Sequence, residues 1–204
     1  MRYVISRKGL IPCPRGCAYP VLQARAERVT CLVGPPYREA DLVNWRNPHT
    51  RPVRDVVMEA IMDRNPLFAV ILGPFGVGKT WLLSAAVRYA WQVKCTALYA
   101  TAADLLSSVR RRFGDGMAED VLDILASVDV LAVDEVDRVS ETAWSESMLL
   151  QVLDRRYREG KVTLMASNAR LEDLPGYLTS RSQDARRGGH VWEWWHLPDL
   201  RRFT

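Results

Sequence analysis

The chain has 204 residues, of which 48% are hydrophobic and 25% are charged, and its formal net charge is +4. This composition excludes a disordered or low-complexity chain, and the length suits one substantial core with a small appendage. No apolar run reaches the length that crosses a bilayer, and the charged residues 1–8 have no extended apolar segment behind them. We therefore expect a cytoplasmic protein without a membrane partner.

The first predicted unit is a small N-terminal extension, residues 1–48, which is rich in proline and has one short helical pattern at residues 21–29. Cys13 and Cys17 have a spacing that is seen in zinc sites, and Cys31 with His49 completes a set of four ligands. A second close pair is missing, so the alternative is that these cysteines are reduced structural thiols. We interpret the extension as an adaptor that binds a partner or Zn²⁺.

The second unit, residues 49–204, alternates helical patterns with short apolar runs, which predicts a parallel sheet with helices on both faces. Helices are predicted at residues 53–63, 81–90, 102–112, 118–127 and 145–158, and strands at residues 67–72, 96–99, 130–133, 162–166 and 191–195. The predicted fold class is therefore α/β with a five-stranded parallel sheet.

The segment that follows the first of these strands fits the phosphate-binding pattern GxxxxGK[ST]. Its glycines let backbone N–H groups close around phosphate oxygens, and the next helix directs the positive end of its dipole at the same charge. Lys79 is expected to reach the β- and γ-phosphates of ATP, and the Thr80 hydroxyl is expected to hold Mg²⁺. The alternative is a glycine-rich turn in an unrelated domain. The predicted nucleotide-binding residues are Gly73, Pro74, Phe75, Gly76, Val77, Gly78, Lys79, Thr80 and Trp81.

Polar side chains follow two later strands, where they predict the hydrolytic half of the site. Asp134 is expected to hold Mg²⁺ through water, and Glu135 is expected to orient and polarise the attacking water. The amide of Asn168 is placed to reach the same water or the γ-phosphate. The alternatives are that the two carboxylates only cap a following helix and that Asn168 is a turn residue.

The phosphate loop, the Asp134 to Glu135 strand end, the Ala-Ala-Asp-Leu-Leu run at residues 102–106, Arg156-Tyr157 and the strand that ends at Asn168 resemble the AAA+ ATPases of the DnaC/DnaI helicase-loader and IstB group. The resemblance begins near residue 52. It implies an AAA+ P-loop fold with a truncated or absent C-terminal lid. It also implies a homo-oligomer whose ATP sites lie between neighbouring subunits.

Further residue roles follow from the resemblance alone. Arg181 matches the arginine that reaches across the interface, with Arg186 and Arg187 as alternatives, and Arg201 matches a nucleotide-sensing arginine. A solvated terminal arginine is the other interpretation of Arg201. The segment that contacts single-stranded DNA corresponds to Arg110, Arg111, Arg112 and Phe113, which otherwise form a solvated helix end.

The resemblance implies two functions, and the nucleotide-site residues leave a third open. The first is an ATPase that loads a replicative helicase onto single-stranded DNA. The second is an IstB-like helper that binds duplex DNA for a transposase. The third is a scaffold that binds nucleotide with little turnover.

Overall fold

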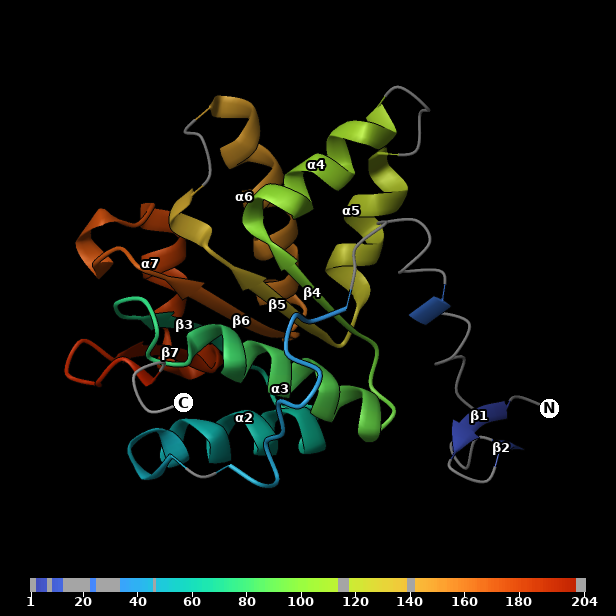
Figure 1. Ribbon diagram of the computed structural model, residues 1–204. Helices are drawn as coiled ribbons and strands as arrows, with labels where there is room; N and C mark the ends of the chain where they lie inside the picture. Colours follow the sequence, from blue (N-terminus) through green and yellow to red (C-terminus); the bar gives the residue numbers. More distant parts are fainter. Residues whose placement is uncertain are drawn as a thin grey trace.

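The computed structural model describes residues 3–6, 9–12, 23–24, 34–45, 47–113, 118–138 and 142–200. Most of these residues form one α/β domain with a central sheet between two layers of helices (Figure 1). Before this domain, β1 (Tyr3–Ser6) and β2 (Gly9–Pro12) form an antiparallel hairpin that the sequence patterns did not predict.

The central sheet has five parallel strands in the order β4-β5-β6-β3-β7, which confirms the predicted sheet. The strands are β3 (Phe68–Leu72), β4 (Ala97–Thr101), β5 (Val130–Asp134), β6 (Val162–Ser167) and β7 (Gly189–Glu193). The strands β3, β5 and β6 are buried along their whole length, as expected for apolar strands covered on both faces.

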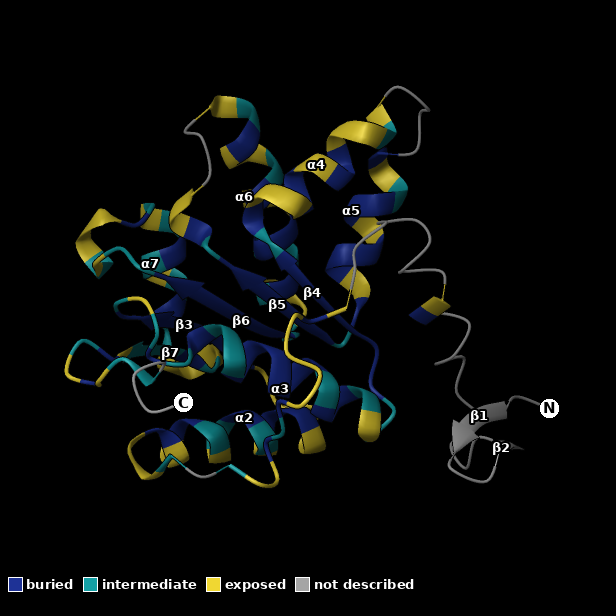
Figure 2. Cartoon of the chain, in the orientation of Figure 1, coloured by how far each residue is buried: buried dark blue, intermediate teal, exposed yellow. Residues whose placement is uncertain are grey.

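Side chains on β3 alternate between two hydrophobic clusters, one on each face of the sheet. Figure 2 shows the central strands β5 and β6 as buried, with most exposed residues on the helices and loops around the sheet. Ala69 and Ile71 pack toward α2 (Arg51–Asp63) and α3 (Lys79–Gln92). The opposite face is covered by α4 (Ala102–Phe113), α5 (Ala118–Ser127), α6 (Ala143–Arg158) and α7 (Gly176–Ser182). Helices therefore cover both faces, as the alternating pattern predicts.

Short 3-10 turns connect these elements: η1 (Pro48–Thr50), η2 (Val136–Arg138), η3 (Leu171–Asp173) and η4 (Ala185–Arg187). The helix α7 was missed because its seven residues are too few for a clear periodic pattern. The strand β7 begins two residues before the predicted run at 191–195, because Gly188, with φ of 73°, turns the chain directly into the sheet.

Residues of the predicted N-terminal extension also contact the domain. Ala40 and Leu42 are fully buried in the hydrophobic cluster that also contains the apolar residues of α2 and α3. The side chain of Gln23 donates to Ala97 O at 3.0 Å and accepts from Ala97 N at 2.9 Å, so it satisfies backbone groups of the edge strand β4. The domain boundary near residue 48 stays a prediction. Across the described ranges, none of the helices combines the length and apolar character needed to cross a membrane.

Candidate nucleotide-binding site

The phosphate loop joins β3 to the first turn of α3. Gly76 and Gly78 have positive φ angles of 84° and 96°, which a side chain would strain. The helix begins at Lys79 without a side-chain cap, so backbone N–H groups of its first turn remain available to an anion. At Gly73, a Cβ atom would lie 3.1 Å from the Cβ of Trp194, so this position has little room for a side chain. The loop has the geometry of a phosphate cradle.

The side chain of Lys79 turns back over this loop. Its Nζ donates to Gly73 O at 2.7 Å, to Pro74 O at 2.8 Å and to Asn168 Oδ1 at 3.0 Å. Burial lowers the pKa of Lys79, and the nearby carboxylates of Asp134 and Asp137 oppose part of that change. The structure therefore brings the phosphate-loop lysine and Asn168 together.

Asp134 is a buried carboxylate at the end of β5. It accepts hydrogen bonds from the Tyr99 hydroxyl and from Glu135 N, both at 2.9 Å. Burial and the adjacent Asp134 raise the pKa of Tyr99, which keeps this phenol protonated as a donor. Asp134 is thus held in one orientation by two donors.

The residues fit a nucleotide-bound Mg²⁺. Asp134 and Thr80 line the same cavity, and the Thr80 hydroxyl has no hydrogen-bond partner within the described part of the chain. Hydroxyl and carboxylate oxygens are the protein ligands that Mg²⁺ uses beside phosphate and water. No group of three or more His, Cys, Asp or Glu side chains that could hold a metal occurs in the described ranges. A magnesium ion here would take most of its ligands from phosphate and water.

One cavity of about 380 Å³ is lined by three predicted catalytic residues, Lys79, Glu135 and Asn168. Glu135 has a φ of 53°, and its carboxylate forms an ion pair with Arg138 at 2.9 Å. The backbone N–H of Asn168 donates to Asp137 at 3.0 Å, which anchors the end of β6 to η2. The lining residues are Tyr37, Phe75, Gly76, Gly78, Lys79, Thr80, Trp81, Asp134, Glu135, Asn168 and Leu200.

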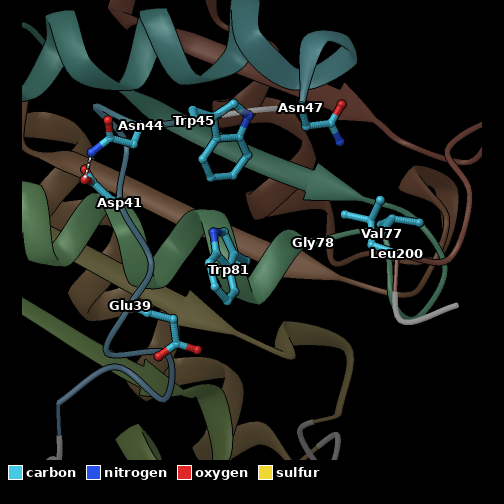
Figure 3. A pocket seen from close by; sticks show the side chains of 9 residues that line it. All are labelled: Glu39, Asp41, Asn44, Trp45, Asn47, Val77, Gly78, Trp81 and Leu200. Carbon is cyan, nitrogen blue, oxygen red and sulfur yellow. Dashed lines mark hydrogen bonds between the residues drawn. The ribbon is translucent and has the colours of Figure 1, made fainter. Parts of the chain in front are cut away.

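A second cavity of about 510 Å³ adjoins the first and shares Gly78, Trp81 and Leu200 with it (Figure 3). Its other walls come from Val77 and from the segment before α2, with the side chains of Glu39, Asp41, Asn44, Trp45 and Asn47. The ring of Trp81 lies 5.1 Å from that of Tyr37. Sequence patterns missed this wall, because the segment carries no motif and is brought to the loop only by folding. The two cavities together provide space for the phosphates and for the nucleoside of one nucleotide.

The C-terminal segment crosses the phosphate loop. Leu200 N donates to Gly76 O at 3.0 Å, and the Leu200 side chain lies against Gly78. Arg201 follows directly but lies outside the described residues, so its nucleotide-sensing role stays a prediction.

Arg181 does not line either cavity. It lies on α7, where its guanidinium pairs with Asp154 of α6 and donates to Tyr177 O at 2.9 Å. Arg186 and Arg187 are exposed on η4, and the guanidinium of Arg187 lies 5.3 Å from the ring centre of Tyr157. The role of these arginines in a neighbouring site therefore stays a prediction, and Arg181 must leave Asp154 to fulfil it.

The predicted DNA residues lie at the end of α4. Arg110, Arg111 and Phe113 are exposed there. The structure adds Trp144, from the first turn of α6, to this group. Its ring lies 4.8 Å from the Arg110 guanidinium and 6.0 Å from the Phe113 ring. The predicted zinc ligands Cys13, Cys17 and Cys31 lie outside the described residues, while His49 lies in η1, so the zinc site stays a prediction.

The strand order and the phosphate loop between β3 and α3 place the chain in the AAA+ class of P-loop nucleotide-binding proteins, as predicted. Two solved structures share this fold. AMPPCP-bound DnaA from Aquifex aeolicus aligns with a TM-score of 0.67 and 24% identity, covering 77% of this chain and 50% of that one. A crystal structure of the DnaC helicase loader aligns with a TM-score of 0.64 and 17% identity, covering 77% and 97%.

Sequence comparison shows to which family within the AAA+ class the chain belongs. Residues 40–181 match the model of the IstB-like ATP binding proteins, and the chain belongs to that family. It is 29% identical over 133 residues to the replicative helicase loader DnaC of Escherichia coli (strain K12), covering 64% of this chain and 54% of that protein. It is also 29% identical over 140 residues to an insertion sequence IS5376 putative ATP-binding protein of Geobacillus stearothermophilus, covering 66% and 55%. The chain thus spans about half the length of these relatives.

Proposed function

We propose that this chain is an ATPase of the DnaC type, which assembles with ATP and loads a replicative helicase onto single-stranded DNA. The observation that carries the proposal is the cavity in which Lys79, Asp134, Glu135 and Asn168 meet beside the phosphate loop. Similarity to the DnaC helicase loader, in sequence and in fold, supports the choice of partner.

In the proposed reaction, the loop N–H groups and Lys79 bind the phosphates and neutralise their charge. Thr80, and Asp134 through water, would hold Mg²⁺, which would supply additional positive charge to the phosphate oxygens. Glu135 orients the attacking water and accepts its proton, and Asn168 supplies a polar contact on the same side of the site. The Tyr99 hydroxyl keeps Asp134 in place for this role.

The proposed site is completed by a neighbouring subunit. An arginine from that subunit, assigned to Arg181, would stabilise the negative charge that shifts during phosphoryl transfer. Nucleotide binding would then favour assembly, because the same nucleotide contacts both subunits. The N-terminal extension, residues 1–48, is assigned to the helicase contact.

The proposed DNA surface consists of Arg110, Arg111, Arg112, Phe113 and Trp144. Guanidinium groups neutralise phosphates, and exposed rings stack on unpaired bases. Trp144 joins two features of this surface, since both the Arg110 guanidinium and the Phe113 ring lie against it. This combination supports a single strand, whose bases are free to stack, over a duplex.

The family match favours one alternative, an IstB-like transposition helper whose partner is a transposase and whose substrate is duplex DNA. The two functions differ in the partner and in the strandedness of the DNA.

The test is affinity capture from the host extract with the Glu135→Gln variant and ATP, followed by identification of the retained proteins. Loss of the proton acceptor is expected to block hydrolysis while ATP binding persists, which traps the assembled state. The proposal predicts that the replicative helicase is retained with ATP and released with ADP, and that single-stranded DNA competes better than duplex. Retention of a transposase with a duplex preference would replace it by the alternative.

A further inference from the structure

The ion pair between Glu135 and Arg138 engages the carboxylate that the proposed reaction requires. Arg138 Nη1 lies 2.9 Å from Glu135 Oε1, and the backbone N–H of Arg138 donates to Glu135 O at 3.0 Å. The tight η2 turn thus brings two residues three positions apart into both contacts. A charge-assisted hydrogen bond from a guanidinium holds a carboxylate oxygen in one direction, toward the donor.

The backbone at Glu135 is unusual as well. Its φ of 53° lies in the left-handed region, which a residue with a side chain adopts only when its surroundings hold it there. Two hydrogen bonds stabilise this conformation: Glu135 N donates to the Asp134 carboxylate, and Arg138 N donates to Glu135 O. Glu135 is therefore fixed by its contacts on both sides of the turn.

A third residue connects this pair to the phosphate loop. Phe75 is 54% exposed at the tip of the loop, and the Arg138 guanidinium lies 5.4 Å from the centre of its ring. The face of an aromatic ring attracts a cation, so Phe75 favours the position in which Arg138 reaches Glu135. Phe75 and Glu135 both line the cavity, whereas Arg138 does not. Arg138 contacts both of these residues.

We infer that Arg138 is a positioning residue that restrains Glu135. With the pair intact, the carboxylate faces the guanidinium, and hydrolysis requires that this contact opens. Phe75 strengthens the restraint from the phosphate loop. This inference rests on the proposed ATPase function and concerns the regulation of the same site.

The test is steady-state ATP hydrolysis by the wild-type chain and by Arg138→Ala, with Glu135→Gln measured in parallel. Arg138→Ala is expected to raise kcat by about two- to fivefold, the range that the strength of a partly exposed ion pair allows, with KM for ATP unchanged. A role in stability alone would not raise kcat. The matched control is Arg155→Ala, which removes another partly exposed arginine, paired with Glu159 at 2.9 Å and also with Asp123, and should leave kcat unchanged.

A double-mutant cycle tests the part of Phe75. If Phe75 acts through Arg138, the effects of Phe75→Leu and Arg138→Ala on kcat are not additive, because the ring has nothing to hold once the guanidinium is gone. Additive effects would overturn the role of Phe75. Suppose that Glu135→Gln abolishes the hydrolysis seen in the wild type, but Arg138→Ala leaves kcat unchanged or lowers it. This result would overturn the inferred restraint by Arg138, while the proposed ATPase function would still hold. Equal hydrolysis by wild type and Glu135→Gln would instead overturn the proposed function.

Discussion

Lys79 Nζ donates a hydrogen bond to Asn168 Oδ1 at 3.0 Å, across 89 positions of the chain. This bond joins the phosphate loop to the end of β6, and two loop carbonyls accept the other hydrogen bonds of the same ammonium group. A phosphate that binds in the cradle would compete with these acceptors for Lys79. The bond therefore places Asn168 beside the lysine to which the proposed reaction assigns phosphate binding.

Asn168→Ala should uncouple catalysis from binding. Loss of a preorganised polar contact in the site is expected to lower kcat about a hundredfold, while ATP affinity changes little because the loop N–H groups and Lys79 remain. Hydrolysis rates and fluorescent-nucleotide titration measure the two quantities. The matched control is Asn65→Ala, which removes an exposed amide just after the end of α2. Equal losses of affinity and turnover would show that Asn168 acts in binding.

Because the pKa of Lys79 is lowered, protein stability and ATP affinity should change in opposite directions as the pH rises. Burial lowers this pKa below the ordinary lysine value of 10.5, so the unfolded chain binds the proton more tightly than the folded one. Between the lowered pKa and 10.5, the contribution of Lys79 to the free energy of unfolding of the nucleotide-free protein should therefore rise with pH. ATP affinity should fall in the same window, because phosphate binding uses the charged form.

Urea denaturation and ATP titration at several pH values measure these trends. Lys79→Met removes the titrating group, so the difference between wild type and this variant isolates its contribution. Trends of the same sign in stability and in affinity would contradict the assignment.

Arg181→Ala should abolish hydrolysis in the assembled state. An arginine supplied from a neighbouring subunit typically accelerates phosphoryl transfer about a thousandfold or more, so a loss of this size is expected with ATP binding retained. Mixing Arg181→Ala with Lys79→Met subunits should restore some activity. At some interfaces of the mixed oligomer, a Lys79→Met subunit supplies its intact Arg181 to the intact phosphate loop of an Arg181→Ala subunit. The control is Asp154→Asn, which removes the ion pair of Arg181 and keeps the guanidinium. If Arg186→Ala has the larger effect, the finger is Arg186.

The end of α4 should determine DNA affinity and its salt dependence. Replacing Arg110, Arg111 and Arg112 by alanine is expected to reduce the slope of log affinity against log salt by about 2, because each phosphate contact on a single strand contributes about 0.7. Phe113→Ala should instead weaken binding about tenfold at every salt concentration, through lost stacking. Fluorescence anisotropy with a labelled single strand measures both, and an unchanged slope in the triple variant would contradict this surface.

Arg156 should be a major determinant of stability. It is completely buried on α6, and its guanidinium donates to the backbone oxygens of Leu125, Ala126, Val128, Asp129 and Val162. Arg156→Lys supplies fewer donors in a different geometry, so buried carbonyls lose their partners. The free energy of unfolding is expected to fall by about 2–4 kcal/mol. Urea denaturation measures it, and Arg158→Lys, 69% exposed on the same helix, should change it little.

The helices, strands and loops of this fold could be predicted from sequence where an apolar pattern was long or where a motif used chemically specific residues. Apolar runs predicted the five strands, and the spacing of Gly73, Gly78 and Lys79 predicted the phosphate loop. Arg156 shows the limit of such patterns. It stood out in the sequence only through the family resemblance, whereas its position among the carbonyls at the end of α5 depends on how α5, α6 and β6 pack.

The sequence by itself determined the chemistry that this chain has available: a phosphate loop, a strand that ends in Asp134 and Glu135, and Asn168 after the next strand. Only the tertiary structure decided which of these groups meet, because parallel strands bring their carboxyl ends to one edge of the sheet, whatever their separation in the chain. It also added the cavity wall from residues 39–47, the pairing of Arg181 with Asp154 and that of Glu135 with Arg138. These contacts depend on the directions of side chains after packing, which periodicity and spacing do not encode.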